Sequence, residues 1–234
     1  MNKFWNFTKN ENDKERTLRI DGDIVSEASF WGDDSDVIPA EFRQELESGK
    51  GDINLWINSR GGDVFAAAQI YTMLKEYPGK VKVKIDGLAA SAASVIAMAG
   101  DTVEMSPVSM LMIHNPLTIC IGNQNDMKAT IDRLDVVKET IMNAYNRKTG
   151  ISRDKLSEMM DAEKYMDAKE AVELGFADSV LYDGEGDENK TKNADYRSMF
   201  ANLLTSKMLE KQTTNIIDKV SAGQLYKRLN LISH

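Results

Sequence analysis

The chain has 234 residues, 42% of them hydrophobic, and a formal net charge of −8. This length suits one domain with an appendage and a buried core, and the acidic charge argues against nucleic acid as the main partner. The longest uncharged apolar stretch, residues 87–100, is too short and too rich in Ala, Gly and Ser to span a bilayer, and the N-terminus carries no signal-peptide core. We therefore expect a cytoplasmic protein without a membrane partner.

Cysteine and histidine are scarce, which limits the available chemistry. Cys120 is the only cysteine, so the chain can form no internal disulfide and no cysteine-based zinc cage, and we expect neither a metal nor a cofactor. A space-filling role is favoured for Cys120 over that of a thiol nucleophile. Of the two histidines, His234 is the last residue of the sequence, so imidazole-assisted catalysis would use His114.

The first half of the chain has the alternating and helical hydrophobic patterns of repeated strand–helix units. The elements expected there are strands over 17–24, 53–57 and 81–85 and helices over 39–48 and 64–76. Residues 58–63 predict a sharp turn between the second strand and the second helix. Residues 87–100 are small and uncharged, which predicts a buried helix with Ser91 near its positive end, the arrangement of a nucleophile elbow.

The second half continues the α/β pattern. Its expected elements are strands over 103–105, 110–113 and 176–181, a long helix over 124–148 capped by Asn123, a helix over 153–160 and a helix capped by Asp167. Together the elements predict an α/β domain with helices packed on a largely parallel sheet.

Three stretches carry residues suited to nucleophilic catalysis: Ser91 at the start of a helix, His114 at the end of a strand, and Gly61-Gly62 before a helix. A serine hydroxyl needs a neutral imidazole to take its proton, and a carboxylate can orient that imidazole. The oxyanion of the tetrahedral intermediate needs backbone N–H donors, for which Ala92 and the glycine pair are suited.

Each feature also has a purely structural interpretation. Ser91 would then cap a packing helix, the glycine pair would form only a turn, and His114 would be a hydrogen-bonded residue at a strand end. The presence of all three in one chain favours catalysis.

These stretches resemble motifs of the Clp protease proteolytic subunit (ClpP) family, which are serine peptidases. Ile57-Asn58-Ser59-Arg60-Gly61-Gly62 resembles the glycine-turn motif, with Arg60 where proline is usual. Gly87-Leu88-Ala89-Ala90-Ser91 resembles the nucleophile motif, and Met112-Ile113-His114-Asn115-Pro116 the histidine motif. Residues 168–179 resemble the last conserved block.

The resemblance covers about residues 17–182 and implies the ClpP/crotonase-like fold, with repeated β-α units and a long handle helix. It implies that Ser91 is the nucleophile, that His114 is the base, and that Gly62 and Ala92 donate N–H groups to the oxyanion. It also implies a homo-oligomer of stacked heptameric rings, in which the handle helix interdigitates between two rings.

The third catalytic residue of the family is an aspartate just before the position of Tyr165-Met166, and alignment on the last block puts Glu163 there. A glutamate can orient an imidazole, but its extra methylene needs a slightly longer gap. Asp161 is the alternative acid, and a solvated loop acid without a catalytic role is the third interpretation of Glu163.

The ends of the chain also depart from the family pattern. Residues 1–16, expected to be flexible, do not resemble the segment that docks the ATPase, which argues against an ATPase partner. Residues 183–234 have the composition of a linker and a helical tail that the housekeeping enzyme lacks. With the Phe4-Trp5 start, these features resemble the phage and prophage head-maturation branch.

We therefore expect an ATP-independent or weakly regulated serine endopeptidase in the cytoplasm, that of the host if a phage encodes it. Its expected substrates are capsid or scaffold proteins. Two other functions stay open. A crotonase-type acyl-CoA enzyme would share the fold and the oxyanion hole but not the Ser–His pair, and a catalytically degenerate assembly factor would contact capsid subunits through the tail.

Overall fold

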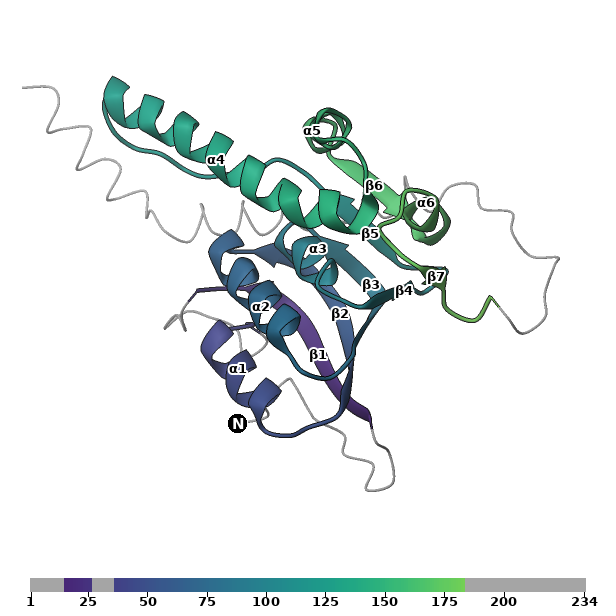
Figure 1. Cartoon of the computed structure of the whole chain (residues 1–234). Coiled ribbons are helices and arrows are strands. Elements are labelled where there is room, and N and C mark those ends of the chain that lie inside the picture. The colour runs from purple at the N-terminus through teal and green to yellow at the C-terminus, as the bar shows by residue number, and fades with distance from the viewer. Residues whose placement is uncertain (1–14, 27–35, 184–234) are drawn as a thin grey trace, which may run out of the picture. The chain divides into compact units, whose positions relative to one another are not determined.

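The computed structural model describes residues 15–26 and 36–183, which form a seven-stranded sheet with helices packed against it (Figure 1). The sheet runs in the order β1-β2-β3-β4-β7, and β5 pairs with both β3 and β6. All neighbouring pairs are parallel except β5–β6. The strands are β1 (Glu15–Ile24), β2 (Asp52–Gly62), β3 (Val81–Ala90), β4 (Thr102–Met105), β5 (Met110–Ile113), β6 (Lys164–Asp167) and β7 (Ser179–Val180).

The expected α/β class is confirmed, because each early strand leads through a helix to its parallel neighbour. The helices are α1 (Pro39–Glu47), α2 (Val64–Glu76), α3 (Ala92–Ala97), α4 (Gln124–Thr149), α5 (Arg153–Asp161) and α6 (Ala168–Glu173). Figure 1 shows α1, α2 and α3 on one side of β1–β3. Alternate residues of these strands are buried against them, among them Ile57 and Ile85. No helix in the described ranges is both long and apolar enough to cross a membrane.

Strand β3 pairs with β4 along its first half and with β5 along its last residues, and this change of partner determines which residues meet at the edge of the sheet. Its first half pairs with β4, up to Ile85 opposite Met105. Its last three residues pair with β5, ending with Ala90 opposite Met112. The chain therefore leaves β3 and β5 side by side, and the residues that follow both strands meet at one edge of the sheet.

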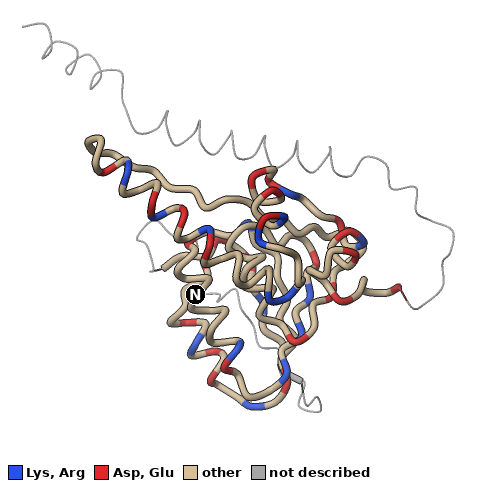
Figure 2. Tube along the Cα trace, turned by 45° about the horizontal axis from the view of Figure 1, so that its top comes forward, with Lys and Arg blue, Asp and Glu red and all other residues tan. Residues whose placement is uncertain are grey.

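Helix α4 begins and ends where the sequence predicts. Asn123 caps its first turn with a capping box, and Gly150 adopts a left-handed conformation at its end. Its buried residues all lie in the C-terminal half, between Ile141 and Tyr145. The N-terminal half projects beyond α3 (Figure 1) and carries both acidic and basic residues (Figure 2). The apolar side chains of α4 are therefore buried only in its last part, and Ile131 is exposed.

Three local expectations are wrong. Residues 87–90 belong to β3 rather than to a helix, because their backbone pairs with β5, and α3 begins only after Ser91. Residues 58–62 continue β2 rather than turning, since they pair with β1 and β3 across a register shift. The last strand is limited to Ser179–Val180, because only these residues pair with β4. The predicted segment 1–16 and the predicted tail 183–234 lie almost entirely outside the described residues.

Candidate active site

Ser91 lies at the turn between β3 and α3 in a strained backbone conformation. Its φ of 54° and ψ of −124° are rare for a residue with a side chain, and such strain persists only where the surroundings enforce it. Its side chain makes no capping hydrogen bond to α3, so the helix-cap interpretation is wrong. Instead, Ser91 Oγ lies 2.7 Å from His114 Nε2.

The pairing of β3 with β5 brings these two side chains together. Ala90 is opposite Met112, and Ser91 N–H donates to the Met112 carbonyl at 3.0 Å. His114 follows the last residue of β5, so the serine and the histidine leave adjacent strands at the same edge. The sequence predicted this meeting from motif order, and the structure supplies its cause, which is the strand register.

His114 is half-buried and its environment favours the neutral imidazole. Burial lowers the pKa of His114, and the negative charge of Glu163 opposes this by raising it. A neutral ring with its proton on Nδ1 leaves Nε2 free to accept the Ser91 hydroxyl proton. Near neutral pH the histidine is thus in the form that a general base requires.

The two glycines at the end of β2 have different surroundings. A Cβ added to Gly61, whose φ is +99°, would lie 2.8 Å from both Ala92 N and Ser91 Cβ, so glycine is required there. Gly61 N–H already donates to Ser59 Oγ at 3.1 Å. Gly62 is exposed at the strand end, and the next amide, that of Asp63, donates to β1.

Ala92 is the first residue of α3 and directly follows Ser91. The amides of the first helical turn have no acceptor within their own helix. The close approach of Gly61 to the Ala92 nitrogen brings the end of β2 beside this amide. The predicted pair of oxyanion donors, Gly62 and Ala92, therefore comes from two chain segments that adjoin at Ser91.

Glu163 adjoins the end of the strand pair that His114 follows. In the antiparallel pair of β5 and β6, the last paired residues are Ile113 and Lys164, and His114 and Glu163 each lie one residue beyond them, outside the strands. Glu163 is exposed and has a positive φ of 46°. Its charge acts on His114. Burial raises the pKa of Tyr165, and the charge of Glu163 raises it to a smaller extent.

Asp161, the alternative acid, has other partners. Its carboxylate accepts from Lys138 Nζ at 2.6 Å and from Asn115 Nδ2 at 2.8 Å, and these two bonds lower its pKa. It does not act on the pKa of His114. Register and electrostatics both favour Glu163 over Asp161 as the acid that faces the histidine.

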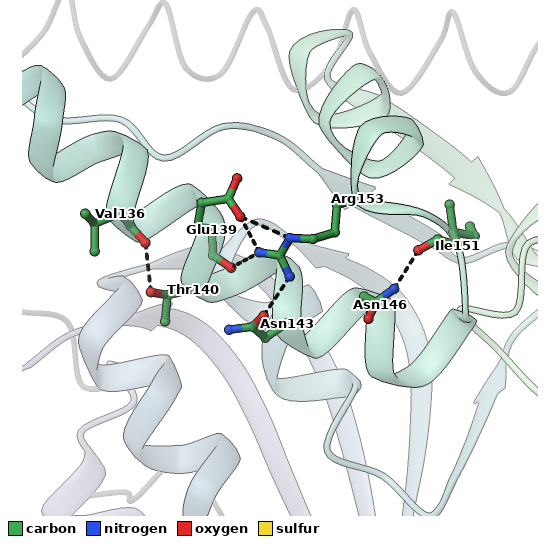
Figure 3. A network of polar contacts seen from close by, with 7 residues as sticks. All are labelled: Val136, Glu139, Thr140, Asn143, Asn146, Ile151 and Arg153. Carbon is green, nitrogen blue, oxygen red and sulfur yellow. Dashed lines mark hydrogen bonds and ion pairs between the residues drawn. The ribbon is translucent and has the colours of Figure 1, made fainter.

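The contacts that hold helix α5 against α4 were not predicted from the sequence. Helix α5 lies just before Glu163 in the chain. At the start of α5, Arg153 donates to the Glu139 carboxylate, to the Glu139 carbonyl at 2.8 Å and to Asn143 Oδ1 at 2.8 Å (Figure 3). At its end, Asp161 binds Lys138. Partners so far apart in sequence leave no local pattern that would have indicated them.

The remaining candidates lie outside this cluster. Cys120 Sγ accepts a hydrogen bond from Thr130 Oγ1 at 3.1 Å, in the segment beside α4. Within the described ranges, no group of three or more His, Cys, Asp or Glu side chains is arranged to hold a metal ion.

A serine and a histidine in contact at the edge of a parallel sheet define the class of site found in serine hydrolases. The sequence model of the Clp protease family matches residues 26–184. The chain is 34% identical over 142 residues to the ATP-dependent Clp protease proteolytic subunit of Bacteroides fragilis, covering 60% of this chain and 68% of that protein. It is 32% identical over 139 residues to proteolytic subunit 2 of Parasynechococcus marenigrum, covering 58% and 71%.

Among solved structures, the chain is similar to a ClpP1 mutant from Listeria monocytogenes. The TM-score is 0.61 at 26% identity, and the match covers 70% of this chain and 90% of that chain. The chain therefore belongs to the Clp protease family, and its fold is the ClpP fold.

Proposed function

We propose that this chain is a serine endopeptidase in which Ser91 is the nucleophile and His114 the general base. The observation that carries the proposal is the 2.7 Å separation of Ser91 Oγ and His114 Nε2. This distance allows direct proton transfer, and the strained serine backbone is the conformation expected of a nucleophile elbow.

The reaction begins when Ser91 Oγ attacks the carbonyl carbon of a peptide bond and its proton passes to His114 Nε2. The carbonyl oxygen becomes an oxyanion that accepts hydrogen bonds from the amides of Gly62 and Ala92. The peptide C–N bond then breaks, and the leaving amine takes the proton from His114. Water hydrolyses the resulting ester by the same route, with His114 again as base.

Glu163 is the acid of this mechanism. A carboxylate opposite His114 stabilises the imidazolium that forms during attack and favours the tautomer with a proton on Nδ1. Support comes from the strand register and from the opposing effect of Glu163 on the His114 pKa.

The substrates and assembly extend the proposal. We infer an ATP-independent or weakly regulated peptidase of phage or prophage origin that works in the host cytoplasm on capsid or scaffold proteins and forms stacked heptameric rings through α4. Support for the substrates comes from the N-terminal sequence, which does not resemble the ATPase-docking segment of the family, and from residues 185–234, which lie beyond the family match. Support for the rings comes from the projecting half of α4. Light scattering that finds only monomer at micromolar concentrations would contradict the rings.

Labelling with a fluorophosphonate probe tests the nucleophile. We expect the wild type to form a covalent adduct at Ser91 and the Ser91→Ala variant to form none. Loss of labelling with unchanged folding in the variant would identify Ser91 as an activated nucleophile. An assembled wild type that takes no label would favour the assembly-factor function instead, and binding of coenzyme A in a titration would favour the acyl-CoA enzyme.

A further inference from the structure

A buried pair of hydroxyl groups lies behind the nucleophile, outside the residues used so far. Ser94, in α3, is fully buried, and Tyr145, in the C-terminal half of α4, is 1% exposed. Their hydroxyl oxygens are 2.8 Å apart. Ser94 Oγ is also 2.6 Å from the backbone carbonyl oxygen of Ser91. The two hydroxyls therefore connect helix α4 to the nucleophilic residue itself.

The direction of these hydrogen bonds follows from the chemistry of the groups. A carbonyl oxygen can only accept, so Ser94 must give its single proton to the Ser91 carbonyl. Ser94 Oγ then has only lone pairs to offer, so the Tyr145 hydroxyl is the donor between these two groups. Burial raises the pKa of Tyr145, which keeps this donor protonated.

The carbonyl that ends this series of hydrogen bonds belongs to Ser91, whose backbone is strained. Ser91 N–H is held by the Met112 carbonyl of β5. The Ser91 carbonyl accepts from the backbone N–H groups of Ser94 and Val95 at 3.0 and 3.4 Å, and from Ser94 Oγ at 2.6 Å, the shortest of the three contacts. The orientation of this peptide determines where Ser91 Oγ points. A strained backbone relaxes unless its polar groups are held on both sides.

We propose that Ser94 and Tyr145 are positioning residues for the nucleophile. The hydrogen bonds from Tyr145 to Ser94 and from Ser94 to the Ser91 carbonyl fix this carbonyl, and they thereby keep Ser91 Oγ directed toward His114. This inference rests on the proposed function, since it assigns a role toward the same serine.

Tyr145→Phe removes one hydroxyl and keeps the ring that packs on Phe176. We expect the maximal rate of phosphonylation by a fluorophosphonate to fall roughly threefold to tenfold, the usual worth of one buried hydrogen bond. The probe concentration for half-maximal rate should stay the same, because the pair does not touch the probe. Tyr77→Phe is the matched control, since the Tyr77 hydroxyl donates to Gly51 O at 2.7 Å, away from the site.

Ser94→Ala removes the hydroxyl that links Tyr145 to the Ser91 carbonyl, and it leaves the Tyr145 hydroxyl without its partner. We expect a larger fall in the maximal phosphonylation rate than for Tyr145→Phe. Ser109→Ala is the control, because Ser109 is buried and its hydroxyl makes the same kind of bond, to the Ser106 carbonyl at 2.8 Å. The double variant of Ser94 and Tyr145 should be phosphonylated no more slowly than Ser94→Ala alone, because both substitutions interrupt the same series of hydrogen bonds.

The results separate the two proposals. If the wild type is phosphonylated at Ser91 and both variants lose rate beyond their controls at equal thermal stability, the positioning role stands. If the wild type is phosphonylated and the variants lose only as much stability as their controls, with unchanged maximal rates, the positioning role is wrong and the peptidase proposal stands. A folded wild type that is not phosphonylated at Ser91 overturns both.

Discussion

The nucleophile side and the acid side of the candidate site are held in different ways. Ser91 lies among buried small residues and main-chain hydrogen bonds, between β3, β5 and the end of β2. Glu163 lies on an exposed turn, and the helix before it is tied to α4 by side-chain contacts of Arg153 and Lys138. Packing against backbone tolerates almost no change, whereas exposed ion pairs contribute little each. Substitutions on the two sides should therefore differ in both size and kind of effect.

Apart from removal of the nucleophile itself, the largest effect should come from Gly61→Ala. The new Cβ would lie 2.6 Å from the Ala90 carbonyl oxygen and 2.8 Å from the Ala92 nitrogen, so backbone at the nucleophile must shift. We expect fluorophosphonate labelling to slow by at least about 100-fold, as for loss of an oxyanion donor. Gly150→Ala is the control, because Gly150 also has a positive φ, of +72°, but its added Cβ meets nothing within 4 Å. Equal labelling rates in the two variants would contradict the close approach of Gly61.

Glu163→Gln should have the next largest effect. Loss of the charge that faces His114 removes stabilisation of the imidazolium, and we expect labelling to slow roughly 10- to 100-fold. Because Glu163 raises the pKa of His114, the low-pH fall in rate should also move to lower pH. Asp161→Asn removes a nearby charge that does not act on His114, so the pH of this fall should stay in place. A shift in Asp161→Asn but not in Glu163→Gln would reverse the assignment of the acid.

The wild-type pH dependence follows from His114 alone. Only the neutral ring accepts the serine proton, so the labelling rate should fall as pH falls through the pKa of His114. Burial lowers this pKa, so the midpoint of the fall should lie below 6.5, the ordinary value for histidine. Labelling rates measured across the mildly acidic range give the midpoint. A midpoint above the ordinary value would mean that the charge of Glu163 outweighs burial.

Arg153→Ala should have the smallest effect. It removes the contacts of α5 with Glu139 and Asn143, which lie on the surface of α4 (Figure 3). We expect a loss of stability of about 1 kcal/mol or less and a twofold to threefold slower labelling, roughly, through looser placement of Glu163. Lys155→Ala is the control on the same helix, because Lys155 pairs with Glu158 within α5. Thermal unfolding and labelling of both variants would show whether the contact with α4 matters.

Much of the fold was predictable because local patterns decide where helices begin and end. The limits of α2 and the Asn123 cap of α4 each depend on a few neighbouring residues, and both were predicted. Residues 87–90 were not, because small apolar residues suit a buried helix and a buried strand equally. Their pairing with β5 decided the outcome. The short strand β6 was missed for the same reason, since it exists only through its pairing with β5.

The sequence by itself identified Ser91 and His114, because these chemical types stand in recognisable motifs and histidine is scarce, and it left Glu163 and Asp161 as alternative acids. Tertiary structure decided which of them meet. The pairing of β3 with β5 sets Ser91 beside His114, and the pairing of β5 with β6 brings Glu163 to the end of the strand that His114 follows, where its charge acts on that histidine. The link between Ser94 and Tyr145 also appears only in three dimensions. The physical reason is that strand pairing and burial act between residues that are distant in the chain, and the sequence around one residue does not indicate which distant residue it will contact.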